Sequence, residues 1–208
     1  MIKSEITIID YGMGNIYSVV SAIQHLGCEA IVSSDPDVIR TSSRLLLPGV
    51  GSFRKAMESI TALRLDGAII EAVKDRGGLI IGICLGMQLL GQQSTENGLT
   101  KGLDLISTQV TSFSDKEVGQ RKIPHIGFDQ VSSAPDSKLF KNISSGSDFY
   151  FVHSYKMHTA NLQGKTAICN YGIDFLAAYE HDNIFATQFH PEKSQTNGLH
   201  LLQNFMSL

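Results

Sequence analysis

The feature that most constrains the fold is an alternation of short apolar runs and helical patterns in the first half of the chain. Apolar runs at residues 6–10, 29–33, 44–47 and 79–83 have the length and composition of buried strands. Residues 16–26 place apolar side chains at helical spacing after a predicted N-cap at Asn15, and residues 54–76 also have helical character. This alternation predicts an α/β fold of three layers, with a mostly parallel central sheet and helices on both faces.

The second half of the chain has a different pattern. Strand-like runs occur at residues 106–113, 126–131, 149–153, 176–179 and 185–189. Clusters of Gly, Ser, Asn and Asp separate them, which predicts hairpins and additional short antiparallel strands. A last helical segment, residues 198–208, is expected to pack back on the sheet. Since no repeat or linker divides the chain, we expect a single domain over residues 1–208.

Composition limits the classes of function. A net charge of -3 and 42% hydrophobic residues are typical of a soluble globular protein that binds neither nucleic acid nor membrane. The longest apolar run, residues 79–91, is shorter than the roughly 20 residues of a membrane span, and the N-terminus does not resemble a signal peptide. The 3 cysteines form no CxxC pair and no histidines lie at metal-ligand spacing, so we expect a cytoplasmic protein with no disulfide, metal or cofactor.

Cys84 is the first candidate for chemistry. It follows the predicted strand 79–83, and Gly82 and Gly86 flank it in the spacing of a nucleophile elbow, a sharp turn between strand and helix. A helix beginning at Leu85 would direct N–H groups toward the thiol, where they would stabilise a thiolate and a developing oxyanion. The spacing alone leaves two interpretations open, a nucleophile or a buried structural cysteine.

His190 is the candidate base for such a nucleophile. It follows a predicted strand, and it is the one histidine of 7 with a carboxylate two positions later, at Glu192. Side chains at i and i+2 of an extended backbone point the same way, roughly 6.6 Å apart, so Glu192 can orient the imidazole. By itself the motif is more typical of a turn with a surface charge. Together with Cys84 and the glycine-rich segment 48–51, which has spare N–H groups, it predicts a cysteine hydrolase site at one edge of the sheet.

Several sequence blocks carry a family resemblance. They are IIDYGMGNIYSV, LLLPGVGSF, GICLGMQLL, IPHIGF, YFVHSY, QFHPEKS and GLHLLQNF. In this order they resemble the class I (triad) glutamine amidotransferases, and they are most similar to the glutaminase subunits of imidazole glycerol phosphate synthases. The resemblance implies an enzyme that hydrolyses glutamine to glutamate and ammonia.

The resemblance also implies roles for individual residues. Cys84 would be the nucleophile, His190 the general base and acid, and Glu192 its orienting carboxylate, while Val50 and Leu85 would supply oxyanion N–H groups. The remaining implied positions are glutamine-binding Gly51 and Gln88 with the backbone near Ser154 and Tyr155, and partner-contacting Asn15, Tyr150 and Lys193.

In the family, ammonia passes to a (β/α)8-barrel cyclase, so the resemblance implies a heterodimer acting in histidine biosynthesis. One position departs from it, because Phe128 and Asp129 stand where the histidine-pathway enzymes usually carry tryptophan and asparagine. Paralogous subunits supply ammonia for sugar amidination in surface-polysaccharide biosynthesis, which is one alternative. A stand-alone γ-glutamyl cysteine hydrolase and a non-catalytic scaffold are two others, although the filled triad positions disfavour a scaffold.

Overall fold

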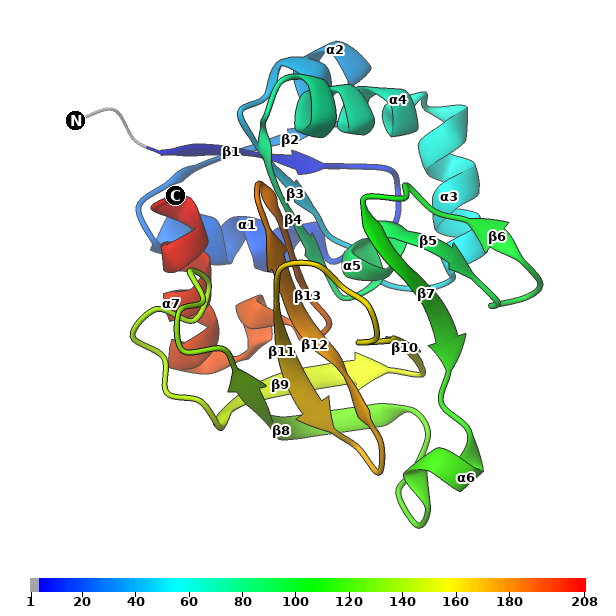
Figure 1. Ribbon diagram of the computed structural model, residues 1–208. Coiled ribbons are helices and arrows are strands. Elements are labelled where there is room, and N and C mark those ends of the chain that lie inside the picture. The colour runs from blue at the N-terminus through cyan, green and yellow to red at the C-terminus, as the bar shows by residue number, and fades with distance from the viewer. Residues whose placement is uncertain (1–3) are drawn as a thin grey trace.

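The computed structural model describes residues 4–208. Within them the strands form a central nine-stranded sheet, in the order β2-β1-β3-β4-β13-β12-β11-β8-β9, and a smaller four-stranded sheet, β10-β7-β5-β6. Helices cover the central sheet on both faces (Figure 1). None of the helices in this part of the chain is both long and apolar enough to cross a bilayer.

One half of the central sheet is parallel. It consists of β2 (Glu29–Ser33), β1 (Glu5–Ile9), β3 (Arg44–Leu47), β4 (Leu79–Ile83) and β13 (Ile184–Thr187). Both faces of these strands are buried, since Leu45 and Leu47 join one apolar core and Leu46 joins the other. Continuous apolar runs are therefore what this half requires.

The helices divide between the two faces. On one face lie α1 (Ile16–His25) and α7 (Gln195–Met206). On the other lie α2 (Pro36–Thr41), α3 (Phe53–Ala62), α4 (Leu65–Ile70), the π-helical turn η1 (Glu71–Asp75) and α5 (Leu85–Leu89). The packing follows from apolar stripes, such as Val19, Ala22 and Ile23 on α1, that face the sheet.

The other half of the central sheet is antiparallel. It consists of β12 (Asp174–His181), β11 (Lys165–Asn170), β8 (His125–Ser133) and β9 (Ser147–His153). The small sheet and its neighbours are β5 (Gly91–Ser94), β6 (Thr100–Lys101), β7 (Ile106–Ser112), α6 (Asp115–Val118) and β10 (Tyr155–Met157). A short 3-10 helix, η2 (Pro191–Lys193), joins β13 to α7.

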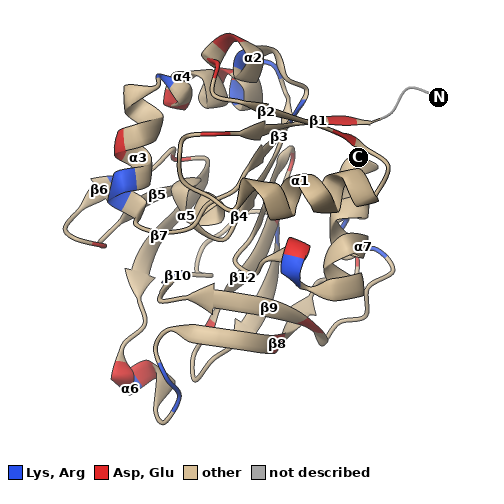
Figure 2. Cartoon of the chain, turned by 180° about the vertical axis from the view of Figure 1, so that it is seen from behind, with Lys and Arg blue, Asp and Glu red and all other residues tan. Residues whose placement is uncertain are grey.

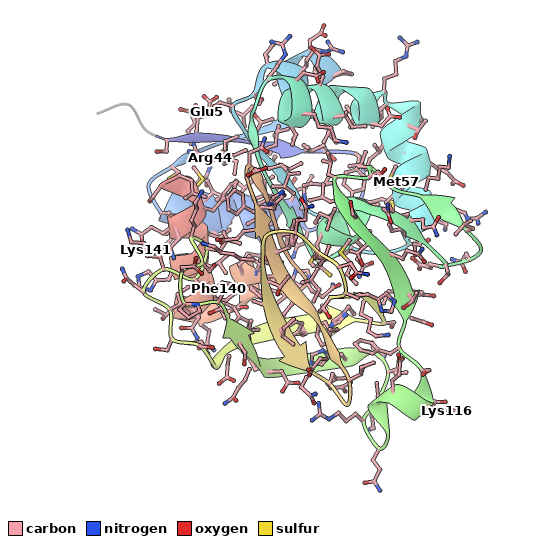
Figure 3. All side chains as sticks on the ribbon, viewed as in Figure 1. Glu5, Arg44, Met57, Lys116, Phe140 and Lys141 are labelled. Atoms are coloured by element: carbon pink, nitrogen blue, oxygen red, sulfur yellow. The ribbon has the colours of Figure 1, made fainter. Side chains whose placement is uncertain are left out.

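Many of the charged residues lie on the peripheral helices (Figure 2). Figure 2 shows them on α2, α3, α4 and α6, whereas α1, which contains no Lys, Arg, Asp or Glu, is uncoloured. In Figure 3, Lys116 extends from α6 into solvent, while Phe140 is directed inward and its neighbour Lys141 outward in the loop between β8 and β9. Phe140 is buried against Phe149 and Phe189, so this loop closes the core beside α7.

The predicted fold class is confirmed, and the four predicted strands of the first half all form. The helical region 54–76 divides into α3, α4 and η1. Strands β5 and β6 fall in a segment where the sequence predicted none, because Gly91–Ser94 has little apolar patterning and pairs through its backbone with β7.

Candidate active site

Cys84 lies in a sharp turn between β4 and α5. Its backbone has φ 55° and ψ -108°, a conformation that costs a non-glycine residue of the order of 1–3 kcal/mol. The Cys84 amide donates to the carbonyl of Thr187 at 2.8 Å, which ties the turn to the end of β13. This is the geometry expected of a nucleophile elbow, and Cys84 as a residue is 6% exposed.

Gly82 and Gly86 allow the turn to form because neighbouring backbone atoms lie too close to each of them for a side chain to fit. A Cβ at Gly86 would lie 1.8 Å from the carbonyl oxygen of Leu47, and one at Gly82 would lie 2.8 Å from the backbone of Gly86. Neither position can hold a side chain while β3, β4 and α5 stay where they are. The glycine pair in the sequence therefore marks backbone packing around Cys84.

His190 and Glu192 form a buried pair behind Cys84. Nδ1 of His190 lies 2.7 Å from Oε1 of Glu192, and both side chains are 2% exposed. Burial lowers the pKa of His190, but the adjacent Cys84 and Glu192 outweigh it and raise the pKa to about 9. An imidazole with this pKa retains a proton at neutral pH, as a thiolate–imidazolium pair requires.

The second ring nitrogen of His190 is free for chemistry. Nε2 is buried and has no hydrogen-bond partner among residues 4–208. The Cys84 thiol is oriented toward the carbonyl of Val152, with Sγ 3.9 Å from the oxygen. Cys84 is nonetheless near enough to this imidazole to raise its pKa.

A pocket of about 340 Å³ opens in front of Cys84. Its volume suits an amino-acid-sized ligand. Cys84 and all the residues expected to hold glutamine or its oxyanion line it, namely Val50, Gly51, Leu85, Gln88, Ser154 and Tyr155. His190 and Glu192 do not line the pocket.

The glycine-rich loop after β3 is pressed against the elbow. The Tyr11 hydroxyl donates to the carbonyl of Pro48 at 2.8 Å, and a Cβ on Gly49 would lie 2.9 Å from Cβ of Leu85. The N–H groups of Val50 and Leu85 donate to no other group in the described chain. Two backbone donors thus remain available on the same side of the pocket as Cys84.

Gln88 is held by the opposite wall of the pocket. Its Nε2 donates to the Tyr155 carbonyl at 3.1 Å and to Oε1 of Gln188 at 3.0 Å. The Ser154 carbonyl accepts from the Phe113 amide at 3.0 Å. Both backbone carbonyls expected near the substrate therefore already accept at least one protein hydrogen bond.

Behind this wall a chain of buried histidines leads to Asp129. Nδ1 of His153 lies 2.7 Å from the Tyr155 carbonyl, Nε2 of His153 lies 3.0 Å from Nδ1 of His125, and Nε2 of His125 lies 2.9 Å from Asp129. Burial lowers the pKa of His153 to about 3, so it is neutral, with its proton on Nδ1 facing the carbonyl. Nδ1 of His125 must then donate to Nε2 of His153. A hydrogen bond between Nε2 of His125 and Asp129 therefore requires one further proton, on either the imidazole or the carboxylate.

The three positions expected at a partner interface lie around η2. Nζ of Lys193 is 5.9 Å from the ring centroid of Tyr150, and the His190 amide donates to the Tyr150 carbonyl at 2.9 Å. Asn15 precedes α1, which packs against η2 (Figure 2). Tyr150 and Lys193 thus lie next to His190, while Asn15 lies at the start of the helix that contacts η2.

Sequence reasoning missed three residues of the site. Glu96 and His153 line the pocket, and Gln188 donates through Nε2 to Sγ of Cys84 at 3.7 Å. Gln188 had a local signal, because it precedes His190 by two positions and so shares its direction in an extended backbone. Glu96 had none, because it lies in a polar loop between β5 and β6. No three His, Cys, Asp or Glu side chains of the described chain are grouped as a metal site would need.

The comparisons with known proteins fit this geometry. Residues 7–208 match the family described as "Glutamine amidotransferase class-I". The chain is 46% identical over 205 residues to "Imidazole glycerol phosphate synthase subunit HisH 1" of Parasynechococcus marenigrum (strain WH8102), with 98% of each chain covered. It is 46% identical over 202 residues to "Imidazole glycerol phosphate synthase subunit HisH" of Chlorobium chlorochromatii (strain CaD3), covering 97% of this chain and 98% of that one.

Solved structures share the fold at lower identity. A chain of PurLQS from Thermotoga maritima superposes with a TM-score of 0.74 at 16% identity, covering 99% of both chains. The glutaminase domain of Trypanosoma brucei CTPS with bound acivicin gives a TM-score of 0.70 at 16% identity, covering 99% of this chain and 94% of that one. The family match over residues 7–208, together with relatives 46% identical over nearly the full length, shows that this chain is an enzyme of the class-I glutamine amidotransferase family.

Proposed function

We propose that this chain is the glutaminase subunit of an imidazole glycerol phosphate synthase in histidine biosynthesis. It would hydrolyse glutamine to glutamate and ammonia and pass the ammonia to a cyclase subunit. The support is twofold: family membership over residues 7–208, and relatives named as HisH subunits that match nearly the full length of the chain. The single observation that carries the chemistry is the buried His190–Glu192 pair adjacent to Cys84, at the back of an amino-acid-sized pocket.

The proposed reaction starts from a thiolate–imidazolium pair, in which Nε2 of His190 holds the proton of the Cys84 thiol. The thiolate attacks the side-chain amide carbon of glutamine, and the resulting oxyanion accepts hydrogen bonds from the N–H groups of Val50 and Leu85. His190 then donates its proton to the amide nitrogen and the C–N bond breaks. Ammonia is released, and the γ-glutamyl group remains bound to Cys84 as a thioester.

Water completes the proposed cycle. His190 takes a proton from the water as it attacks the thioester carbon, and the C–S bond breaks to release glutamate. The sulfur leaves as a thiolate beside the protonated His190, which restores the starting pair. Glu192 holds Nδ1 of His190 throughout and stabilises each imidazolium that forms, which its 2.7 Å contact makes possible.

Two side chains are suited to hold the amino-acid end of glutamine. Glu96 presents a carboxylate to the pocket, where it can pair with an α-ammonium group. Gln88 lines the same pocket, one helical turn after Cys84, and its amide is already oriented by Tyr155 and Gln188. Gly51 completes this side of the proposed glutamine site.

The proposed partner is a (β/α)8-barrel cyclase, bound as a heterodimer through Asn15, Tyr150 and Lys193. Free ammonia becomes ammonium in water and loses its nucleophilicity, which explains why ammonia should be released beside a docked acceptor enzyme. The hydrogen bond from the His190 amide to Tyr150 offers a direct mechanical link between that interface and the base. We propose no nucleic-acid or membrane partner and expect the complex in the cytoplasm.

Reconstitution with a cyclase subunit tests the proposal. The wild-type pair should form product from glutamine or from ammonium salts, whereas a Cys84→Ala pair should use ammonium salts alone. Loss of both activities in a well-folded Cys84→Ala complex would contradict ammonia transfer. If the wild-type pair forms no product from glutamine, the glutaminase function itself is contradicted.

One observation favours a second acceptor. Phe128 is 48% exposed beside Tyr150, with ring centroids 5.4 Å apart, so it adds an apolar contact to the proposed interface where histidine-pathway enzymes usually carry tryptophan. The alternative is a subunit that supplies ammonia for sugar amidination. Assaying the co-purifying partner for conversion of an imidazole-glycerol precursor against a nucleotide sugar distinguishes the two.

A further inference from the structure

Gln188 lies next to the nucleophile and outside the lining of the proposed substrate pocket, in a position that the mechanism above leaves unused. Its side chain is 0% exposed, and it contacts Gln88 through Oε1 and Cys84 through Nε2. The backbone of Gln188 is anchored independently, because its amide donates to the Ala177 carbonyl at 2.8 Å. The strand end therefore does not need this side-chain amide to keep its place.

The direction of each hydrogen bond follows from one backbone carbonyl. The Tyr155 oxygen can only accept, so the Gln88 atom that faces it must be the nitrogen, Nε2. The same Nε2 faces the amide of Gln188, which must then present its oxygen there. The nitrogen of Gln188 is left facing Sγ of Cys84, at 3.7 Å. A donor at the sulfur is thus fixed by the network.

An N–H at this place distinguishes the two states of the sulfur. A thiol sulfur is a weak acceptor, whereas a thiolate carries a full charge and forms a charge-assisted hydrogen bond. The thiolate attacks in the first step and is the leaving group in the second, so stabilising it serves both. A buried amide is costly unless its groups are bonded, and here both of its ends are used.

We propose that Gln188 is a further catalytic residue, which donates Nε2–H to the Cys84 thiolate and couples the nucleophile to Gln88 in the glutamine pocket. This inference rests on the proposed role of Cys84 as the nucleophile. A substrate that fixes the Gln88 amide also fixes the Gln188 amide bonded to it. Binding of glutamine in the pocket is thereby linked to stabilisation of the Cys84 thiolate.

The test is the pH profile of Cys84 alkylation by iodoacetamide in the full chain, followed at the Cys84 peptide by mass spectrometry. Gln188→Met keeps the length of the side chain and removes the donor, so the midpoint of the profile should rise by about one pH unit, a tenfold loss of thiolate at fixed pH. Gln188→Glu keeps the shape but places a carboxylate oxygen at the sulfur, and its midpoint should rise further. Thr108→Val, which removes a buried hydrogen bond to the His158 carbonyl elsewhere, should leave the midpoint unchanged.

An unchanged midpoint in folded Gln188→Met would overturn the inference, because a space-filling role predicts no shift. If Gln188→Met does not fold, Gln188→Leu, which also removes the donor without adding a charge, decides in its place. The measurement needs neither glutamine nor a partner, so it separates the two proposals. A shifted midpoint in a chain that no cyclase activates would sink the proposed synthase function and leave the Gln188 donor standing.

Discussion

In the parallel half of the central sheet, the positions of the strand ends bring the site residues together. Cys84 follows β4 and His190 follows the neighbouring β13, so their proximity results from two adjacent parallel strands ending at the same edge. In the antiparallel half and the small sheet, the site is made by side chains. His125, His153 and Tyr155 come from β8, β9 and β10, and hydrogen bonds join them behind the pocket.

The difference indicates where each half is vulnerable. The parallel half depends on backbone contacts that no added atom can enter, so small changes there should be structurally severe. The antiparallel half depends on donors and acceptors that a matched polar group can replace, so its substitutions should act through protonation and at lower cost.

The largest expected effect follows Gly86→Ala. Its Cβ would lie 1.8 Å from the Leu47 carbonyl, so β3 and α5 must separate, and the free energy of unfolding should fall by more than about 4 kcal/mol. Urea unfolding measures this. Gly67→Ala is the matched control, because its Cβ meets nothing within 4 Å in helix α4 and should stabilise by roughly 0.5–1 kcal/mol. Equal stability of the two variants would break the comparison.

Glu192→Gln should follow next, acting on catalysis. Loss of the carboxylate leaves His190 without its orienting charge, and kcat for glutamine hydrolysis in the complex should fall roughly 10²–10⁴-fold. The exposed Glu58→Gln on α3 serves as a control. A Glu192→Gln complex with wild-type kcat would exclude the proposed orienting role.

The same pair sets a pH dependence of stability. Because the pKa of His190 is raised to about 9, its contribution is complete below about 6.5, the unfolded value, and is lost as pH rises from 6.5 to 9. Unfolding midpoints measured across this window should decline in the wild type and decline less in Glu192→Gln. Parallel curves would contradict the assignment.

His153→Gln should have a smaller effect and the opposite pH window. The pKa of His153 is lowered to about 3, so the unfolded chain binds a proton that the folded chain does not, and stability falls as pH drops from 6.5 toward 3. A glutamine can still donate to the Tyr155 carbonyl, so the variant should lose about 1–2 kcal/mol at pH 7 but resist acid better. A steeper acid loss in the variant would be contrary to this account.

Asp129→Asn should have the smallest effect, and a favourable one. At pH 8 a carboxylate cannot donate to Nε2 of a neutral His125, whereas the asparagine amide can, so the free energy of unfolding should rise by up to about 1 kcal/mol. Asp148→Asn on β9 is the control for loss of one charge. A destabilised Asp129→Asn at pH 8 would show that the carboxylate is needed as such.

The parts of the site that could be predicted from sequence are those with a local signature. The spacing of Gly82, Cys84 and Gly86 predicts a sharp turn. His190 and Glu192 are two positions apart, so their side chains are predicted to point the same way and to pair. Glu96 could not be predicted, because its place in the pocket depends on how the β5–β6 hairpin folds over α3. There its carboxylate accepts from the Phe53 amide at 2.7 Å.

The sequence by itself determined the parallel half of the sheet, because continuous apolar runs and helical periodicity are properties of neighbouring residues. It also identified the side chains that we propose carry the chemistry, since thiol, imidazole and carboxylate are chemical identities that folding does not alter. Only the tertiary structure decided their surroundings: the pKa of His190 near 9, the neutral His153, and the donor that Gln188 presents to Cys84. The physical reason is that hydrogen-bond direction and burial depend on residues brought together from distant parts of the chain. A pattern of neighbouring residues in the sequence does not show these long-range contacts.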